Sequence, residues 1–251
     1  MTTEERRNSI EAMVKEKGEL DVKLIRERFE ISNVTVRNDL MFLERKGTIN
    51  RQFGKAVVRG DRIADMDAKR IINLDAKEKI GKFAASMVSD NDSIFLYTGS
   101  TTLQIARFIP LKTNFIAATN CIYIAHELRK YQSAKIVFIG GNLSLETGAT
   151  FGAQVIKQLE LYNIDKLFLA VNGIDAESGV TNDSLYETDI NFALIKKAKK
   201  VIVVADHTKI GVTRFIHMGR IEDVDVLITD GKASETAVKA LRDKGVEVHA
   251  V

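Results

Sequence analysis

The sequence predicts an α/β protein in which a small helical module precedes a larger domain with a mostly parallel sheet. Residues 1–58 hold three short amphipathic helical patterns and then an alternating segment around a glycine. Residues 76–251 alternate short β-branched runs with helical patterns, as in parallel sheets whose strands are joined by helices. Residues 59–75 between them are charged and weakly periodic. We expect a linker there, which could be a helix or a hinge but is best interpreted as a solvated connector.

Composition limits the possible functions. The 251 residues are 45% hydrophobic, enough for a sizeable core and two domains, and the net charge is only +3. Residues 32–60, however, carry six Lys and Arg against two acids, so the charge of this segment is 6 − 2 = +4. A basic patch on a nearly neutral chain is typical of a module that binds a polyanion.

Several classes of protein are disfavoured. The single cysteine, Cys121, excludes an intramolecular disulfide, and the four scattered histidines show no metal-ligand spacing. We therefore expect no metal and no cofactor. No apolar run reaches the length of a membrane span, and the N-terminus lacks a signal-peptide core. We therefore expect a cytoplasmic protein without a membrane partner.

The first two helices of the module have recognisable ends. Thr3 is expected to cap a helix over residues 4–17, which Gly18 terminates, and Asp21 is expected to cap a second helix. The residues expected to face the core are Ile10, Met13, Val14, Val22, Ile25 and Phe29.

The third helix has the pattern of a DNA-recognition helix. Ser32 is a good N-cap, and Val36, Leu40 and Leu43 recur at a spacing that buries one stripe. The opposite face carries few of the mixed Glu and Lys residues of an ordinary solvated helix. Its residues are Val34, Arg37, Asn38, Met41 and Arg45, with Thr35 at the flank. Arginine pairs with guanine, asparagine with adenine, and small apolar groups contact the thymine methyl. The alternative is a surface helix of a small α domain.

Residues 48–58 alternate around a glycine and predict a β-hairpin wing, so the module is interpreted as a winged helix-turn-helix. Arg51 and Lys55 on the wing would contact phosphate or the minor groove. Asp39 lies near the buried stripe and is expected to orient an arginine or the helix rather than touch DNA. The candidate DNA-binding residues are Ser32, Asn33, Val34, Thr35, Arg37, Asn38, Arg45, Arg51 and Lys55.

This module resembles the DeoR family of bacterial sugar-metabolism repressors. The matching residues are Ser32, Thr35, Val36, Arg37, Asp39 and Leu40, followed by Leu43-Glu44-Arg45-Lys46-Gly47. Two positions depart from the family pattern: Asn38 stands where a second arginine is usual, and Lys55 where a second glycine is usual. We expect Asn38 to alter the base preference.

Seven strands are predicted in the larger domain, at residues 93–97, 114–118, 135–139, 166–171, 201–205, 226–229 and 246–251. Parallel sheets bind ligands at the carboxyl ends of their strands. Most of these strand ends carry glycine or a small polar residue, which would also be found in ordinary turns. The candidate ligand-binding residues are Thr98, Gly99, Ser100, Thr101, Thr102, Asn120, Gly140, Gly141, Gly173, Asp175, Glu187, Asp206 and Lys209.

These candidates divide by chemistry. The loop at Gly99 precedes a helix, and its outward hydroxyls and free N–H groups would suit a phosphate together with Lys209. Asn120, Asp175, Glu187 and Asp206 would suit sugar hydroxyls. A simpler interpretation makes Asp206 a strand-end cap and Lys209 a member of a surface ion pair.

The resemblance to the DeoR family continues through this domain. It is carried by the loop Gly99-Ser100-Thr101, the pair Gly140-Gly141, the run Gly173-Ile174-Asp175, Glu187, and Asp206 with Lys209. The resemblance implies a fold similar to ribose-5-phosphate isomerase and a phosphorylated sugar as inducer. Tyr97 stands where the family usually has an aspartate ahead of the loop, so the resemblance implies a different effector preference.

The sequence thus predicts a repressor of a carbohydrate-utilisation operon. Its expected partners are double-stranded operator DNA, a phosphorylated sugar and further copies of the chain in a dimer or tetramer. Two alternatives remain. The protein could be a sugar-phosphate isomerase with an accessory DNA-binding module, using Glu187 or Asp175 for proton transfer. It could also be a structural DNA-binding protein without an effector.

Overall fold

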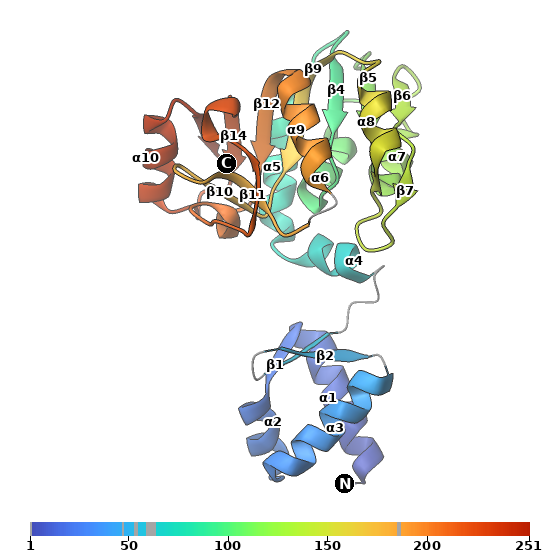
Figure 1. The fold of residues 1–251 in the computed structure, drawn as a ribbon, viewed down its shortest axis with the longest axis vertical. Coiled ribbons are helices and arrows are strands. Elements are labelled where there is room, and N and C mark those ends of the chain that lie inside the picture. The colour runs from blue at the N-terminus through green and yellow to red at the C-terminus, as the bar shows by residue number, and fades with distance from the viewer. Residues whose placement is uncertain (1, 47, 53–54, 59–63, 185–186) are drawn as a thin grey trace. The chain divides into compact units, whose positions relative to one another are not determined.

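The computed structural model describes all residues except 1, 47, 53–54, 59–63 and 185–186 (Figure 1). The chain divides into two compact units, Met1–Ala64 and Asp65–Val251, each with its own hydrophobic core. The predicted fold class is confirmed: a winged helix-turn-helix is followed by an α/β unit on a parallel sheet.

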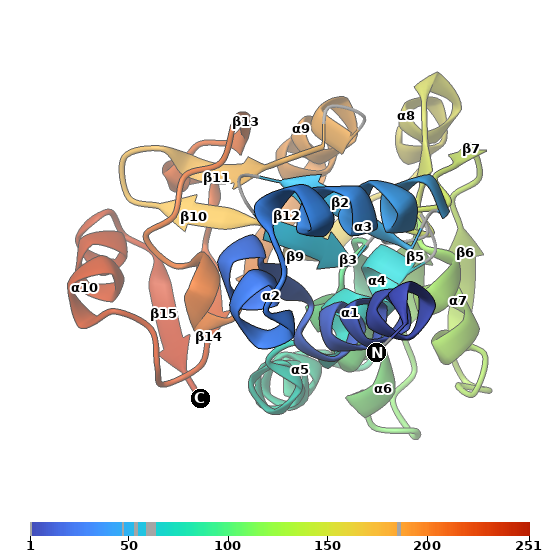
Figure 2. The same ribbon diagram turned by 90° about the horizontal axis from the view of Figure 1, so that it is seen from below.

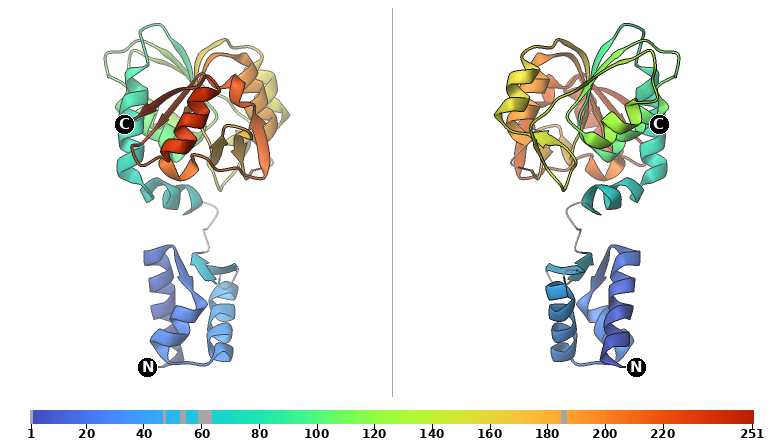
Figure 3. Two further views of the ribbon diagram at one scale, coloured as in Figure 1. Left: turned by 90° about the vertical axis from the view of Figure 1, so that its left-hand side faces the viewer. Right: turned by 90° about the vertical axis from the view of Figure 1, so that its right-hand side faces the viewer.

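The N-terminal unit consists of three helices and a small sheet, shown from two sides in Figure 3. Its elements are α1 Thr3–Lys17, β1 Glu19–Asp21, α2 Val22–Phe29, α3 Asn33–Lys46, β2 Ile49–Gln52 and β3 Lys55–Val58. One expected cap was wrong. Thr2 rather than Thr3 caps α1. The Thr2 hydroxyl accepts from the Glu5 backbone N–H, and the Glu5 carboxylate accepts from the Thr2 backbone N–H.

The core of this unit contains the residues expected to face inward. Ile10, Val14 and Ile25 are buried, while Met13, Val22 and Phe29 are partly buried against them. The strands form an antiparallel sheet in the order β1-β3-β2, of which β2 and β3 are the predicted wing. Strand β1 was not predicted, because three residues are too few to show alternation.

The C-terminal unit begins within the segment expected to be a linker. Of that segment, residues 59–63 lie outside the described residues, and the rest is largely helical, in α4 Ala64–Ile71 and α5 Leu74–Ser86. Met66 is buried in the core of the C-terminal unit, and the Lys77 amine donates to the Lys69 carbonyl. In the described part Met66 is therefore packed on the core, while Ile71 and Ile72 are exposed.

A parallel sheet of seven strands forms the centre of the C-terminal unit. Its strands are β4 Ser93–Leu96, β5 Ile116–Thr119, β6 Lys135–Phe138, β9 Ile164–Ala170, β12 Ala198–Val204, β14 Val226–Thr229 and β15 Glu247–Ala250. All seven predicted strands are present, and every neighbouring pair is parallel. The strand order is β15-β14-β12-β9-β4-β5-β6. From β4 the chain adds β5 and β6 on one side, and then adds β9, β12, β14 and β15 on the other. The strand order therefore reverses between β4 and β9, and open α/β sheets bind ligands at such a point.

Helices and short antiparallel pieces complete the unit. The helices are α6 Ser100–Phe108, α7 Ile122–Leu128, α8 Ala153–Leu159, α9 Thr188–Lys197 and α10 Glu235–Asp243, with short 3-10 turns η2 His207–Lys209 and η3 Ile221–Asp223. The further strands are β7 Asn142–Leu143, β8 Thr150–Phe151, β10 Gly173–Asp175, β11 Gly179–Asn182 and β13 Ile216–Gly219. These five strands pair in antiparallel fashion and were not predicted.

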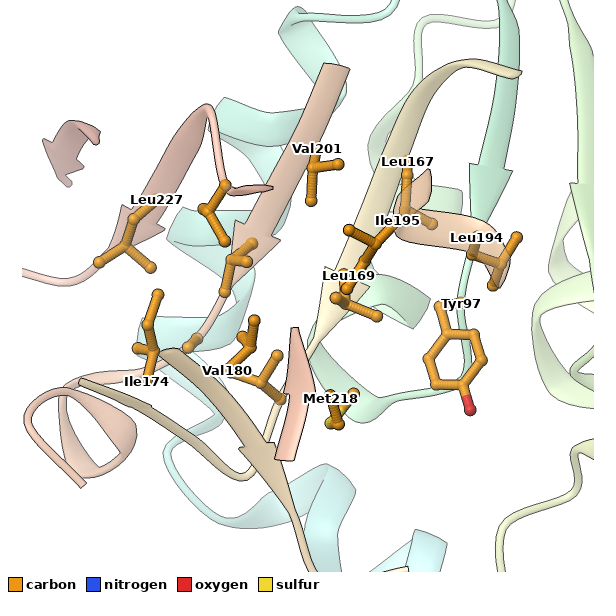
Figure 4. Packing of buried hydrophobic residues seen from close by; sticks show 14 of the residues in the cluster. Tyr97, Leu167, Leu169, Ile174, Val180, Leu194, Ile195, Val201, Met218 and Leu227 are labelled. Carbon is orange, nitrogen blue, oxygen red and sulfur yellow. The ribbon is translucent and has the colours of Figure 1, made fainter. Parts of the chain in front are cut away.

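The two faces of the sheet bury different side chains, because successive residues of a strand point in opposite directions. On one face Phe95 and Tyr97 lie among residues of α8, α9 and α10, and Figure 4 shows part of this cluster. On the other face Ile94 and Leu96 pack with α5, α6 and α7. Figure 2 shows α8 and α9 on one side of the sheet and α5 and α6 on the other.

The Tyr131 side chain binds the C-terminal end of α6 through its hydroxyl, and this contact can be tested. Its buried hydroxyl lies 2.8 Å from the Ala106 carbonyl oxygen and 2.9 Å from that of Ile109. Burial raises the pKa of Tyr131 from 10.0 to about 12, assisted by the charge of Glu127. Because the folded state favours the neutral phenol, this contribution to stability is complete below pH 10 and is lost as pH rises toward about 12.

We expect Tyr131→Phe to lower the free energy of unfolding at neutral pH by about 1–2 kcal/mol, since two buried carbonyls lose their donor. The variant should also lose less stability than the parent between pH 10 and about 12, the interval between the ordinary and raised pKa values. Urea unfolding at a series of pH values measures both effects. Parallel stability curves for the two proteins across this interval would contradict the prediction.

Candidate DNA interface and ligand site

The exposed face of α3 is created by a firm cap and a buried stripe. The Ser32 hydroxyl accepts from the Thr35 backbone N–H at 3.1 Å and lies 2.9 Å from the Thr35 hydroxyl, so Ser32 is the N-cap. Val36, Leu40 and Leu43 are buried as predicted. The opposite face is open to solvent: Val34 is 68% exposed, and Asn33, Arg37 and Asn38 are exposed too.

This face offers a guanidinium, a carboxamide and a branched apolar tip within two helical turns. These groups can read guanine, adenine and the thymine methyl in a major groove. The hydroxyls of Ser32 and Thr35 contact each other in the cap, which sequence reasoning did not anticipate. The side chains of Arg45, Arg51 and Lys55 lie outside the described residues, although α3, β2 and β3 include their backbones.

Asp39 anchors α3 to α1. Its carboxylate is fully buried and accepts from Arg6 Nε and Arg7 Nε, each at 2.7 Å. Asp39 was expected to orient an arginine, and in the structure it holds two, Arg6 and Arg7. Sequence reasoning did not identify Arg6 or Arg7, because no local pattern links residues more than thirty positions apart.

The loop between β4 and α6 forms an open helix N-terminus at the point where the strand order reverses. Leu103 N donates to the Gly99 carbonyl at 3.0 Å, which makes Gly99 the N-cap, and no side chain caps this helix. The N–H groups of the first helical residues, Ser100, Thr101 and Thr102, lack i−4 acceptors within the helix. An anion is favoured at such an end by these groups and by the helix dipole.

Gly99 is required by close packing. A Cβ atom on Gly99 would lie 2.3 Å from Ala170 Cβ on β9, so a side chain would push the loop off the sheet. The expectation that the loop hydroxyls face outward is wrong for Thr98 and Thr102, whose hydroxyls donate to carbonyls of the chain, while Thr101 is buried as a residue. Thr102 Oγ1 donates to the Gly99 carbonyl at 2.9 Å, and Ser100 alone of this loop's hydroxyl side chains is partly exposed.

A group of lysines lies near the end of β12. Lys77 on α5 is only 5% exposed, and burial lowers its pKa; Asp206 opposes this effect, while the charges of Lys209 and Lys69 add to it. These four groups therefore share one electrostatic neighbourhood. Sequence reasoning identified Asp206 and Lys209 but missed Lys77, because lysine is rarely buried even at a position on the apolar stripe of a helix.

Asp206 has the role of a strand-end cap. It accepts from the Thr208 backbone N–H and the Asn73 amide, both at 3.1 Å, and from the Thr208 hydroxyl. Although burial alone would raise it, the pKa of Asp206 is held below its ordinary value by the bonds from Thr208 and the charges of Lys209 and Lys77. Asp206 is thus a buried anion among lysines.

A polar group around Glu187 lies on the face of the sheet that holds Tyr97 and α9. Glu187 is buried and accepts from Asn182 Nδ2 at 2.8 Å. Burial raises its pKa, although Asn182 and Lys69 oppose the shift. Tyr97 is 1% exposed, and its hydroxyl interacts with Glu187 and Asn191. The pKa of Tyr97 is raised well above 10.0, first by burial and then by the Glu187 charge. Within the described residues, neither the Tyr97 hydroxyl nor the Asn191 amide finds a partner in hydrogen-bonding geometry.

The remaining candidates are engaged by the scaffold. Asn120 Nδ2 donates to the Thr150 carbonyl at 3.0 Å, and its buried Oδ1 finds no partner in the described chain. Gly140 exchanges hydrogen bonds with the Gln158 side chain. Asp175 accepts from the backbone N–H groups of residues 177 and 178 in the turn between β10 and β11; the bond from Ser178 is the main cause of its lowered pKa.

Two glycines permit close backbone approaches. A Cβ atom on Gly141 would lie 2.7 Å from the Phe151 carbonyl oxygen. One on Gly173 would lie 2.3 Å from the Val212 carbonyl oxygen. Both positions therefore have packing reasons for glycine, whether or not they contact a ligand.

Two features are absent from the described residues. No three His, Cys, Asp or Glu side chains of this part of the chain gather in a way that could hold a metal ion. None of the helices seen there has both the length and the apolar character needed to cross a membrane.

Comparisons with known proteins cover both units. A family model described as the DeoR-like helix-turn-helix domain matches residues 6–61, and one described as the DeoR C terminal sensor domain matches residues 72–231. The transcriptional repressor GlcR of Bacillus subtilis is 31% identical, with 99% of this chain and 96% of the relative covered. The transcriptional regulator GlpR of Haloferax volcanii is 30% identical, with 99% and 98% covered.

Among solved structures, ribose 5-phosphate isomerase A from Methanocaldococcus jannaschii aligns with a TM-score of 0.40 and 19% identity. The alignment covers 55% of this chain and 54% of the isomerase.

Proposed function

Because the chain belongs to the DeoR family of DNA-binding transcriptional regulators, we propose that it represses a carbohydrate-utilisation operon under the control of a phosphorylated sugar. The observation that carries this proposal is the coexistence of an exposed reading face on α3 with an uncapped helix N-terminus where the strand order reverses. The relatives named as repressors support the same function.

For DNA, we propose that the face of α3 enters the major groove. Arg37 and Asn38 contact base edges, Val34 contacts a thymine methyl, and the cap residues at 32, 33 and 35 lie near the backbone. Arg45, Arg51 and Lys55 supply phosphate or minor-groove contacts.

For the effector, we propose that the phosphate binds the N-terminus of α6. The backbone N–H groups of Gly99, Ser100 and Thr101 are its donors, with Lys209 as a counter-ion. Lys77 joins this set because it is a buried cation in the same electrostatic neighbourhood. Thr98 and Thr102 keep the loop in place from within.

The sugar hydroxyls are assigned to Asn120, Glu187 and Asp206. Asn120 Oδ1 is a buried acceptor without a partner in the described chain, and Glu187 is a carboxylate beside the unpaired Tyr97 hydroxyl. A ligand that supplied hydrogen bonds to these atoms would relieve the cost of burying them unpaired. The glycines at 140, 141 and 173 and the turn residue Asp175 shape the surrounding backbone.

We propose that at least two copies of the chain bind the operator, because paired winged helices on two half-sites bind tightly when their spacing matches the DNA. We propose that the effector favours a subunit arrangement in which this spacing is lost. The effector can shift the equilibrium only by the difference between its affinities for the two arrangements.

The test is a fluorescence anisotropy titration of labelled DNA from upstream of the coding region, followed by addition of sugar phosphates and their unphosphorylated counterparts. We expect sequence-specific binding that one phosphate ester reverses and its parent sugar does not. Binding that no compound alters would refute the effector proposal and leave the DNA-binding function intact.

One observation favours a second candidate function. The buried carboxylate of Glu187 has a raised pKa, as is useful in a proton-transfer isomerase. A coupled assay with pentose and hexose phosphates separates the two functions, with Glu187→Gln as control. We expect no turnover by either protein; turnover by the parent alone would establish the isomerase.

A further inference from the structure

We propose that Arg7 on α1 binds a DNA phosphate beside the reading face of α3, and that Asp39 holds it there. This inference rests on the proposed insertion of α3 into the major groove. It adds a contact from a helix outside the helix-turn-helix pair, in a part of the module where the sequence pattern predicted no DNA-binding residue.

The position of Arg7 follows from two contacts. Its Nε donates to the buried Asp39 carboxylate at 2.7 Å, and its guanidinium carbon lies 4.0 Å from the centre of the Phe42 ring. With about 3.6 residues per turn, Phe42 lies between Asp39 and Asn38 around the axis of α3. Phe42 is itself exposed. Arg7 is therefore held along the border of the face that carries Asn38.

The chemistry of the pair leaves Arg7 able to bind a second anion. A guanidinium has five N–H donors, and the hydrogen bond to Asp39 is made through Nε–H. Two arginines share one carboxylate, so the group of Arg6, Arg7 and Asp39 carries a net charge of +1. A cation that is planar, stacked on an aromatic ring and fixed by an ion pair loses little entropy on binding phosphate.

Arg6 differs from Arg7 in exposure and surroundings. The Arg6 side chain is 14% exposed and the Arg7 side chain 24%, and the contact with Phe42 belongs to Arg7. We therefore assign Arg6 to the anchoring of α3 and Arg7 to both anchoring and phosphate binding. Arg6 becomes the matched control, since it has the same charge, lies on the same helix and contacts the same carboxylate.

The experiment removes one arginine at a time, so that Asp39 stays in place and keeps the other arginine as its partner. The full-length parent is compared with Arg7→Gln and with Arg6→Gln. For each protein, affinity is measured for operator and for unrelated DNA over a range of salt concentrations. Loss of one phosphate contact reduces the slope of log affinity against log salt by about 0.9.

We expect Arg7→Gln to weaken binding to both DNAs by the same factor, about tenfold, and to lower the salt slope by about 0.9 for each bound copy of the chain. Arg6→Gln should change the slope by less than half as much. A merely structural role for Arg7 would leave the slope unchanged. An unchanged slope, or equal effects of the two substitutions, overturns the proposal.

Arg7→Lys in the otherwise unaltered chain gives a second route that keeps the ion pair with Asp39. Lysine retains the charge but lacks the fork, so we expect about threefold weaker binding to both DNAs with the salt slope preserved. Unaltered affinity for both DNAs would count against a phosphate contact at Arg7. If the parent protein itself failed to bind DNA specifically, the proposed reading face would fail instead, so the two failures are distinguishable.

Discussion

Arg37→Ala is expected to abolish specific operator binding without unfolding the N-terminal unit. Arg37 is exposed, on the face of α3 opposite Val36, Leu40 and Leu43, so its loss leaves the core untouched. One bidentate contact with guanine is worth about 1–3 kcal/mol, and a dimer on two half-sites would lose two such contacts. Specific affinity should therefore fall by roughly 30-fold to about 25,000-fold. Anisotropy titration with operator and unrelated DNA measures this loss.

The control for this prediction is Arg37→Lys, which keeps the charge but not the planar fork. It should retain most of the affinity for unrelated DNA and lose most of the preference for the operator. Thermal unfolding should be within about 0.5 kcal/mol of the parent for both variants, as is usual at exposed sites. Undiminished operator preference in Arg37→Ala would mean that α3 does not read the bases through this residue.

Ser100→Glu is expected to produce a repressor that no longer responds to its inducer. Ser100 is the first residue of α6, where a carboxylate interacts favourably with the helix dipole, so the fold should tolerate the change. The same carboxylate would lie where the effector phosphate is proposed to bind. At an effective dielectric constant of about 20, two unit charges about 4 Å apart repel by about 4 kcal/mol. Inducer affinity should therefore fall by roughly 100- to 1,000-fold.

The matched control is Ser100→Gln, which has the size of glutamate without its charge. We expect Ser100→Gln to remain inducible with a modest loss of affinity, while Ser100→Glu binds operator normally at every effector concentration. Isothermal titration of the effector and the anisotropy assay report the two halves of this result. A normal response of Ser100→Glu would move the phosphate site away from α6.

Much of the fold could be predicted because it depends on local order along the chain. The period of Val36, Leu40 and Leu43 predicted a helix with one buried face, and the short β-branched runs predicted all seven strands of the parallel sheet. The short antiparallel strands escaped prediction, since two to four residues cannot display a period. The error at Thr2 was of one residue, as expected where two threonines stand side by side.

The candidate site could be predicted only in outline. Strand ends meet at one edge of a parallel sheet, so the residues directly after each predicted strand indicated the Gly99 loop, Asp206 and Lys209. Their order along the chain could not reveal that the Thr98 and Thr102 hydroxyls bond to carbonyls of the chain, or that Asp175 is bonded within its own turn. Those outcomes depend on the rotation of each side chain against neighbours that are distant in sequence.

By itself, then, the sequence determined the order of helices and strands, the exposed face of α3 and the family resemblance, because periodicity, caps and motifs are read from neighbouring residues. Only the tertiary structure decided which distant residues meet. It placed Arg6 and Arg7 on Asp39, and Lys77 beside Asp206. It also set Tyr97 against Glu187 and pressed Gly99 onto Ala170. The physical reason is that burial and charge pairing are properties of packed elements, and the packing brings together groups that no spacing along the chain relates.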